Sequence, residues 1–189
     1  MPRPRSDERR NAILAAATRV LGTHGLSTTT AAIAQDAGVS NGSLFVYFDT
    51  KAILFNELYV ALKTEMAEAA AAGLPSSGSA RDQVHHLWTQ WLRWATSNPD
   101  KRRALAQLDV AEEISDESRQ LVRAAQRDTA ELIERSRADG PMVAVPLSFV
   151  MVLITAMADA TTDAVLNEPE QSSTHSEVAF EAVWRVLAG

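Results

Sequence analysis

The chain has 189 residues, 46% of them hydrophobic, and a formal net charge of -6 at pH 7. Because it contains no cysteine, disulfide scaffolds, thiolate metal sites and cysteine nucleophiles are excluded. The charge is unevenly distributed: residues 1–51 hold six basic and four acidic residues, and the other 138 residues hold 12 basic and 20 acidic residues. Only the first quarter of the chain is therefore suited to meet phosphates, unless this small excess is scatter.

Almost every segment longer than ten residues repeats its hydrophobic residues at helical spacing, and no stretch alternates with a period of two. We therefore predict an all-α fold of about nine helices. The first helix is expected to begin after Ser6, which is a suitable N-cap, and to end near residue 22. A short second helix follows Thr29 and closes at Gly38, and Ser40 caps a third helix.

A long helix is predicted after Lys51, and residues 74–79 form the clearest loop. Further helices are expected over residues 80–97, 99–110, 115–138, 146–166 and 173–187. The N-terminus lacks the apolar segment of a secretory signal, so a cytoplasmic protein is expected. Residues 142–158 are uncharged, but this stretch is only just long enough to span a bilayer and contains a proline, so no membrane contact is expected.

The most informative segment is residues 28–51, TTTAAIAQDAGVSNGSLFVYFDTK. It predicts two short helices around a tight turn at Gly38, with Leu44 and Phe48 anchoring the second helix to the core. Two helices that cross steeply over a small turn form a helix-turn-helix, in which the second helix enters the major groove of double-stranded DNA. The residues then left on the outer side are Asn41, Gly42, Ser43, Val46 and Tyr47.

These outward residues have chemistry suited to base edges. An asparagine amide pairs with adenine, a serine hydroxyl reaches a base or a phosphate, and a valine contacts the thymine methyl group. Hydroxyls, helix-end amides and one ammonium group lie around them, where phosphates are expected: Thr28, Thr29, Ser40, Tyr47 and Lys51. The alternative is that Thr29 and Ser40 are only helix caps, but the two roles are compatible.

This segment resembles the DNA-binding signature of the TetR family of regulators. The matching features are Thr28-Thr29, Ile33-Ala34, Ala37-Gly38-Val39-Ser40, Gly42-Ser43-Leu44, Tyr47-Phe48 and Lys51. The resemblance implies that residues 41–43 and Val46 contact bases, and that Thr28, Thr29, Tyr47 and Lys51 contact the DNA backbone. It also implies that residues 1–51 form the DNA-binding domain and residues 52–189 a ligand-binding and dimerisation domain.

Two residues depart from the family pattern, which often has a lysine in place of Asn41 and a tyrosine in place of Phe45. Because Phe45 cannot donate a hydrogen bond to a phosphate, we expect fewer backbone contacts from this helix. An N-terminal arm is expected to compensate, unless it is only a solubilising tail. Its basic residues are Arg3, Arg5, Arg9 and Arg10.

A lone helix-turn-helix contacts too few base pairs for specificity, so we expect a homodimer on a palindromic operator. The last two helices are predicted to supply the dimer interface, as the resemblance implies. The interface residues are expected to be Leu153, Met157, Phe180, Val183, Trp184 and Leu187. The alternative is that these side chains form the core of a single chain.

The resemblance implies a small-molecule effector in the body, and we expect its pocket to be lined by Trp88, Trp91 and Phe149, although tryptophans at helical spacing more often belong to a core. Adjacent His85 and His86 point in different directions, so no metal site is predicted, and no cofactor is expected. The sequence holds no recognisable catalytic motif, so an enzyme is not expected.

Together these features predict a repressor that leaves its operator when the effector binds. Two alternatives remain open at this stage. The first is a DNA-binding regulator controlled by a protein partner, and the second is a helical enzyme or scaffold that does not bind DNA.

Overall fold

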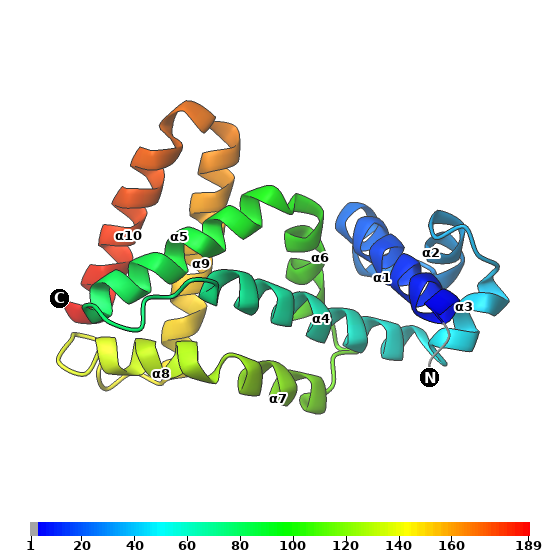
Figure 1. Ribbon diagram of the computed structural model, residues 1–189, viewed down its shortest axis with the longest axis horizontal. Helices are drawn as coiled ribbons and strands as arrows, with labels where there is room; N and C mark the ends of the chain where they lie inside the picture. The colour runs from blue at the N-terminus through cyan, green and yellow to red at the C-terminus, as the bar shows by residue number, and fades with distance from the viewer. Residues whose placement is uncertain (1–3) are drawn as a thin grey trace. The chain divides into compact units, whose positions relative to one another are not determined.

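The computed structural model describes residues 4–189, with side chains from residue 7 onward. Within this range the chain forms ten α-helices and two short 3-10 helices, which confirms the all-α fold with one α-helix more than the nine expected (Figure 1). The chain divides into two compact units. Unit 1 comprises the residues up to Thr64 together with Asn98–Arg123, and unit 2 comprises Glu65–Ser97 and Ala124–Gly189. The functional boundary expected at residue 51 stays a prediction.

Unit 1 contains the predicted helix-turn-helix. Its elements are α1 (Pro4–His24), η1 (Gly25–Ser27), α2 (Thr30–Asp36), α3 (Asn41–Tyr47), the first two thirds of α4 (Lys51–Ala71), α6 (Pro99–Asp109) and most of α7 (Asp116–Ala125). Fully buried side chains from α1 to α4 form its core: Ile13, Leu21, Ile33, Leu44, Phe48, Leu54 and Phe55. Burial of such apolar side chains stabilises the three-helix arrangement by about 1.5–3 kcal/mol each.

The start of α1 differs from the prediction. The helix begins at Pro4 instead of after Ser6, as a proline in the first turn allows, since its missing N–H has no partner there anyway. Arg5, Arg9 and Arg10 belong to α1 and not to an extended arm, whereas Arg3 lies outside the described residues. Arg10 forms an ion pair with Glu57 and its guanidinium lies 5.4 Å from the centre of the Phe48 ring.

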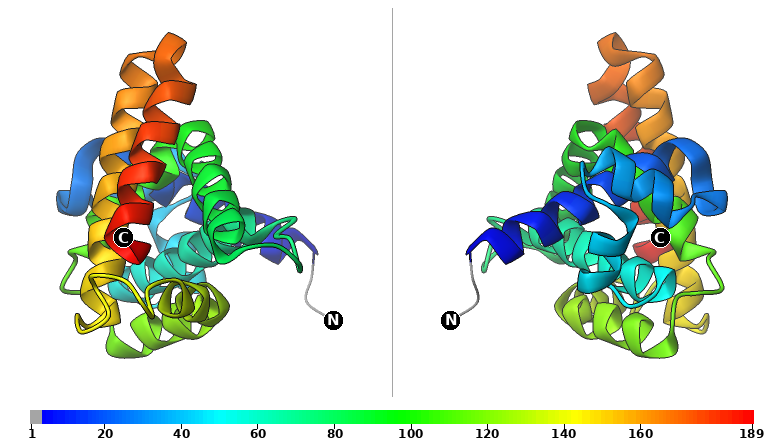
Figure 2. Two further views of the ribbon diagram at one scale, coloured as in Figure 1. Left: turned by 90° about the vertical axis from the view of Figure 1, so that its left-hand side faces the viewer. Right: turned by 90° about the vertical axis from the view of Figure 1, so that its right-hand side faces the viewer.

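Unit 2 is built on a pair of long helices that lie side by side, α9 (Leu147–Asn167) and α10 (Ser172–Ala188), joined by η2 (Pro169–Gln171) (Figure 2). The last turns of α4, α5 (Ala80–Ser97) and α8 (Arg127–Ser136) complete it. Its core draws on four helices and comprises Val84, Leu87, Trp88, Leu92, Leu132, Ile133, Val150, Ala158, Phe180, Val183 and Leu187.

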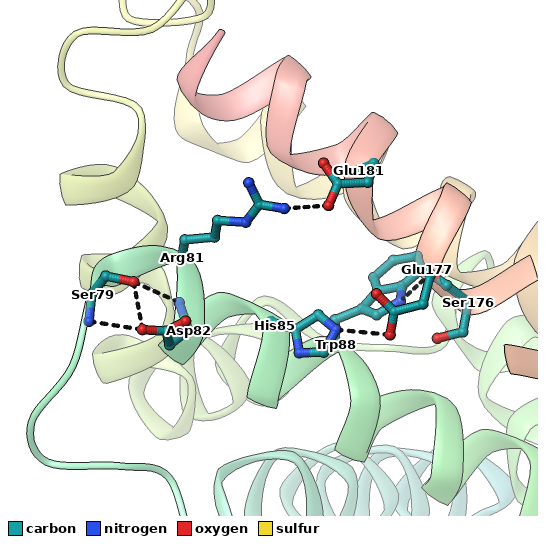
Figure 3. A network of polar contacts seen from close by, with 8 residues as sticks. All are labelled: Ser79, Arg81, Asp82, His85, Trp88, Ser176, Glu177 and Glu181. Carbon is teal, nitrogen blue, oxygen red and sulfur yellow. Dashed lines mark hydrogen bonds and ion pairs between the residues drawn. The ribbon is translucent and has the colours of Figure 1, made fainter. Parts of the chain in front are cut away.

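Polar contacts fasten α5 to α10 across this core. Figure 3 shows three of them: Arg81 with Glu181, His85 with Glu177, and Trp88 with the backbone of Ser176. The indole N–H of Trp88 donates to the Ser176 carbonyl at 3.2 Å. This bond satisfies the one polar atom of a side chain that is otherwise inside the core.

The single helix expected over residues 115–138 is interrupted. Helices α7 and α8 are separated at Gln126, whose φ of -99° and ψ of 10° lie off the regular helix. No proline or glycine marks the break in the sequence. The two helices instead bury residues in different units, Val122 in unit 1 and Leu132 with Ile133 in unit 2, and that tertiary requirement overrides the helical preference of the segment.

Among the described residues, α9 is the one helix long and apolar enough to cross a membrane by length and composition, and 22% of its most apolar window is buried inside the chain. The core helix of a folded protein meets the same criteria, so this is weak support for a membrane span. What α9 does show is an apolar outer side: Phe149 is 52% and Val152 61% exposed.

Candidate nucleic-acid interface

The turn between α2 and α3 is set by local backbone chemistry. Thr29 caps α2 as predicted, because its Oγ1 accepts the N–H of Ala32 at 3.2 Å. Gly38 follows the helix with a φ of +68°, which glycine adopts without strain. The N–H of Val39 then donates back to the carbonyl of Ala34 at 3.0 Å, so the chain reverses within a few residues.

Helix α3 is held at both ends. Ser40 caps it as predicted: its Oγ accepts the N–H of Ser43 at 3.1 Å and lies 2.8 Å from the Ser43 hydroxyl. Leu44 and Phe48, one turn apart, are fully buried and fix the helix on the core of unit 1. The inward side of α3 is therefore determined by packing, and its outward side is free of that constraint.

The outward side of α3 is not covered by the part of the chain that the structure describes. Asn41 and Gly42 are exposed, and Val46 is 79% exposed. Ser43 and Tyr47 are partly buried at the edges of this surface. Phe45, which was not among the predicted contact residues, is also exposed; its position one turn after Asn41 is the signal that would have found it.

Two residues expected at the phosphates have other partners. Thr28 is buried and its hydroxyl lies 3.5 Å from the carbonyl oxygen of Val20, so its side chain offers almost no surface to a ligand. The Lys51 ammonium donates to the carbonyl oxygen of Leu26 at 2.9 Å and lies 4.9 Å from the centre of the Phe55 ring. Lys51 thereby fastens the start of α4 to the segment that precedes α2.

Ion pairs hold α1 against the other helices of unit 1. Arg19 donates twice to one carboxylate oxygen of Asp36 at the end of α2, from Nε at 3.0 Å and from Nη2 at 2.6 Å. Arg10 forms the corresponding pair with Glu57 on α4. These side chains are partly exposed, so each pair contributes modestly to stability and more to the orientation of the helices.

The three residues predicted to line an effector pocket differ in how far their side chains are buried. Trp88 belongs to the core of unit 2, and Trp91 is half-buried with its indole N–H directed at the sulfur of Met66, 3.2 Å away. Phe149 is exposed on the outer side of α9. These residues thus range from the core to the surface, and a pocket lined by all three stays a prediction.

The predicted interface residues are also divided. Phe180, Val183 and Leu187 are at most 1% exposed in a single chain, so they offer no surface to a partner. The others are half-buried: Leu153, Met157 and Trp184. The exposed stripe of α9 lies one position away along the helix and comprises Phe149, Val152, Ala156 and Ala160.

Comparison with known proteins relates both the sequence and the fold of this chain to one family of regulators. Residues 13–58 match the family model of bacterial regulatory proteins of the tetR family. Among solved structures, a protein described as a TetR-family transcription regulator from Shewanella sp. PV-4 is 27% identical with a TM-score of 0.85, over 96% of this chain and 98% of that chain.

Two further structures extend the comparison. A TetR-family transcription regulator from Marinobacter aquaeolei VT8 is 21% identical with a TM-score of 0.80, over 99% of both chains. The TetR-like regulator LfrR from Mycobacterium smegmatis, solved in complex with proflavine, is 18% identical with a TM-score of 0.68, over 93% of this chain and 94% of that chain. The helix-turn-helix of unit 1, the match of the tetR family model over it and the shared fold of the whole chain lead to one conclusion: this chain has the DNA-binding sequence signature and the fold of TetR-family transcription regulators.

Proposed function

We propose that this regulator is a homodimeric repressor of the cytoplasm that binds a palindromic operator through α3 and leaves it when a small molecule binds to its body. The observation that supports this most directly is the open outer side of α3, where Val46 is 79% exposed. A single exposed valine is ordinary on a protein surface, so the support comes from its position: Val46 lies on the outer side of the second helix of a helix-turn-helix, which is the helix that enters the major groove.

In this proposal the residues of unit 1 divide into two groups. Asn41, Gly42, Ser43 and Val46 contact base edges in the major groove. Thr29, Ser40 and Tyr47 contact the phosphate backbone, with Lys51 near it as a cation whose first task is to hold Leu26. Thr28 is left out of the contact set because its side chain is buried.

The dimer surface that we propose is the outer stripe of α9. Phe149 and Val152 provide apolar area there, and the small residues Ala156 and Ala160 allow a second helix to approach closely. The stripe repeats every three to four residues, as the contact line between two helices does. Residues 52–189 would then carry dimerisation and effector binding, and residues 1–51 would carry DNA binding.

For the effector we propose a site beside Trp91, the half-buried tryptophan of α5. Its indole borders both the core of unit 2 and the surface, so a ligand bound there would contact a large aromatic face. The proflavine complex of LfrR supports effector binding in a relative of the same fold. Release from DNA requires only that the effector prefer a dimer conformation whose recognition helices do not match the operator.

The test is selection of duplexes from a random pool by the full-length chain, followed by titration of the enriched duplex and a scrambled control at two salt concentrations. We expect an enriched palindrome whose half-sites lie about one DNA turn apart and that binds more tightly than the scrambled duplex at both salt concentrations. A chain that enriches no sequence would contradict the proposal. Repression by release is then tested by screening small molecules for a change in tryptophan fluorescence together with loss of the bound duplex.

A further inference from the structure

The surface that α3 offers to DNA contains no charged side chain. Residues 41–47 have the sequence NGSLFVY. Guanine is most often recognised by arginine or lysine, which donate to its O6 and N7, and cytosine by a carboxylate that accepts from its N4 amino group. None of these groups occurs on this helix, so its chemistry favours adenine, through the Asn41 amide, and thymine, through apolar contact.

Val46 is the side chain best placed for an apolar contact. With about 3.6 residues per turn, it lies on the opposite side of α3 from the direction midway between the buried Leu44 and Phe48. Side chains of a helix lean towards its N-terminus, over the residue four positions earlier, which here is Gly42. Since Gly42 has no side chain, no side chain of α3 covers the Val46 isopropyl group on the side that faces Gly42.

The fold itself does not require a glycine at position 42. Its φ is not positive, and a Cβ placed there would have no neighbour closer than the Ser40 Oγ at 3.9 Å. A glycine inside a helix also lowers its stability relative to alanine. The surface at Gly42 therefore leaves room for a group from outside the chain to approach the backbone closely.

From these observations we propose that Val46, above the open surface at Gly42, contacts the 5-methyl group of thymine, and that Asn41 selects adenine, so that this chain prefers an operator half-site whose bases under α3 are A·T pairs distinguished by their methyl groups. The inference rests on the proposed DNA contact of α3 and specifies what that contact recognises. Phe45, exposed on the neighbouring side of the helix, extends the apolar surface.

The experiment uses the full-length chain and a duplex enriched by selection, and it changes one atom group at a time. At each T·A pair of the half-site, uracil replaces thymine, which removes only the methyl group. At the most sensitive pair, C·G and 5-methyl-C·G are then compared, which tests the same methyl group on a different base pair. We expect loss of about fourfold in affinity for each contacted methyl, the factor that corresponds to the transfer of one such group out of water.

The protein variants assign the effect to a side chain. In Val46→Ala the difference between thymine and uracil should shrink at the same pair, whereas Val110→Ala should keep it, because Val110 is similarly exposed but lies at the end of α6. Both substitutions are at the surface and leave the core of unit 1 intact. Circular dichroism checks that the two variants are folded.

The outcomes separate the two proposals. If the chain binds a selected duplex but uracil is tolerated at every pair, or the thymine preference is unchanged in Val46→Ala, the methyl contact is refuted and DNA binding stands. Enrichment of half-sites made of G·C pairs would refute it too. If no duplex is enriched at all, the proposed function itself fails.

Discussion

The side chains of α3 have two different roles, according to the side of the helix on which they lie. Leu44 and Phe48 hold the helix on unit 1 and are fully buried, whereas Val46 is exposed and contributes nothing to the core. Substitutions on the two sides should therefore differ in kind: inward changes lower stability, and outward changes alter DNA binding without lowering stability.

Gly42 gives the clearest test of that separation. Gly42→Ala should raise the free energy of unfolding by about 0.5–1 kcal/mol, because alanine is the better helix former and a Cβ has room there. It should also weaken binding to the selected operator, because the methyl group enters the space that DNA would occupy. Urea unfolding and fluorescence anisotropy measure the two effects, and a variant that is both less stable and equally tight would contradict this reasoning.

Tyr59 on α4 makes a prediction about alkaline pH. Burial, and then the nearby Asp109 carboxylate, raise the pKa of its phenol above the ordinary value of 10.0. As the pH rises past about 10, unfolded chains lose the phenol proton before folded chains do, so stability falls with pH in that range. Thermal unfolding from pH 8 to pH 11 should show a smaller alkaline loss in Tyr59→Phe, and the loss should persist in Tyr47→Phe, where Tyr59 is still present.

The sequence predicts the role of a single residue when its contacts are with near neighbours in the chain, and fails when they are with distant segments. The caps Thr29 and Ser40 act within three residues and were predicted correctly. The burial of Thr28 and the bond from Lys51 to Leu26 arise from segments far apart in the chain. A pattern of residue types carries no information about such contacts, so these two side chains were assigned to phosphates.

At the scale of elements, the difference between local signals and contacts with distant segments explains which helix boundaries were predicted. The boundaries of α2, α3 and α5 follow from local signals and agree with the sequence to within about two residues. The break at Gln126 has no local signal, because it results from two helices that pack into different cores. On α9 the apolar character agrees with the prediction, whereas the predicted interface residues Leu153 and Met157 lie on the half-buried side next to the exposed stripe.

The loop between α8 and α9 is held in place by hydrogen bonds to its backbone carbonyls and by close packing of its backbone. The buried Arg137 guanidinium donates to the carbonyls of Met142, Val143 and Val145, and also pairs with Glu134. Gly140, in the same loop, lies against the end of α10 so closely that a Cβ would overlap the carbonyl oxygen of Leu187. The loop and the C-terminus of α10 are thus fitted to one another.

Gly140→Ala should therefore destabilise the chain, by about 1–3 kcal/mol, because the backbone of the loop or of α10 has to move to accept the methyl group. The measurement is urea unfolding followed by tryptophan fluorescence. Gly42→Ala is the matched control, since the same substitution there is expected to change stability in the opposite direction. Equal stability of Gly140→Ala and the unaltered chain would show that the loop adjusts freely.

At the scale of the whole molecule, the proposed dimer depends on the outer stripe of α9. Val152→Asp should convert the dimer to a monomer, because the interface would bury an unpaired carboxylate. Sedimentation at several concentrations measures the change, with Val110→Asp as the control at another exposed valine, outside α9. A dimer that survives Val152→Asp would place the interface elsewhere.

The internal partners of the basic residues in unit 1 set how operator binding responds to ionic strength. Of the six cations in residues 1–51, Arg10, Arg19 and Lys51 are already engaged by Glu57, Asp36 and the Leu26 carbonyl. The Leu26 carbonyl does not neutralise Lys51, so four of these six cations remain to displace counterions from DNA, and the logarithm of the association constant should fall with that of salt concentration with a slope of about -3.6 per protomer or shallower. A steeper slope would mean that these internal bonds open on the operator. With such a slope on each of two protomers, occupancy of the operator would still fall steeply when a cell takes up salt.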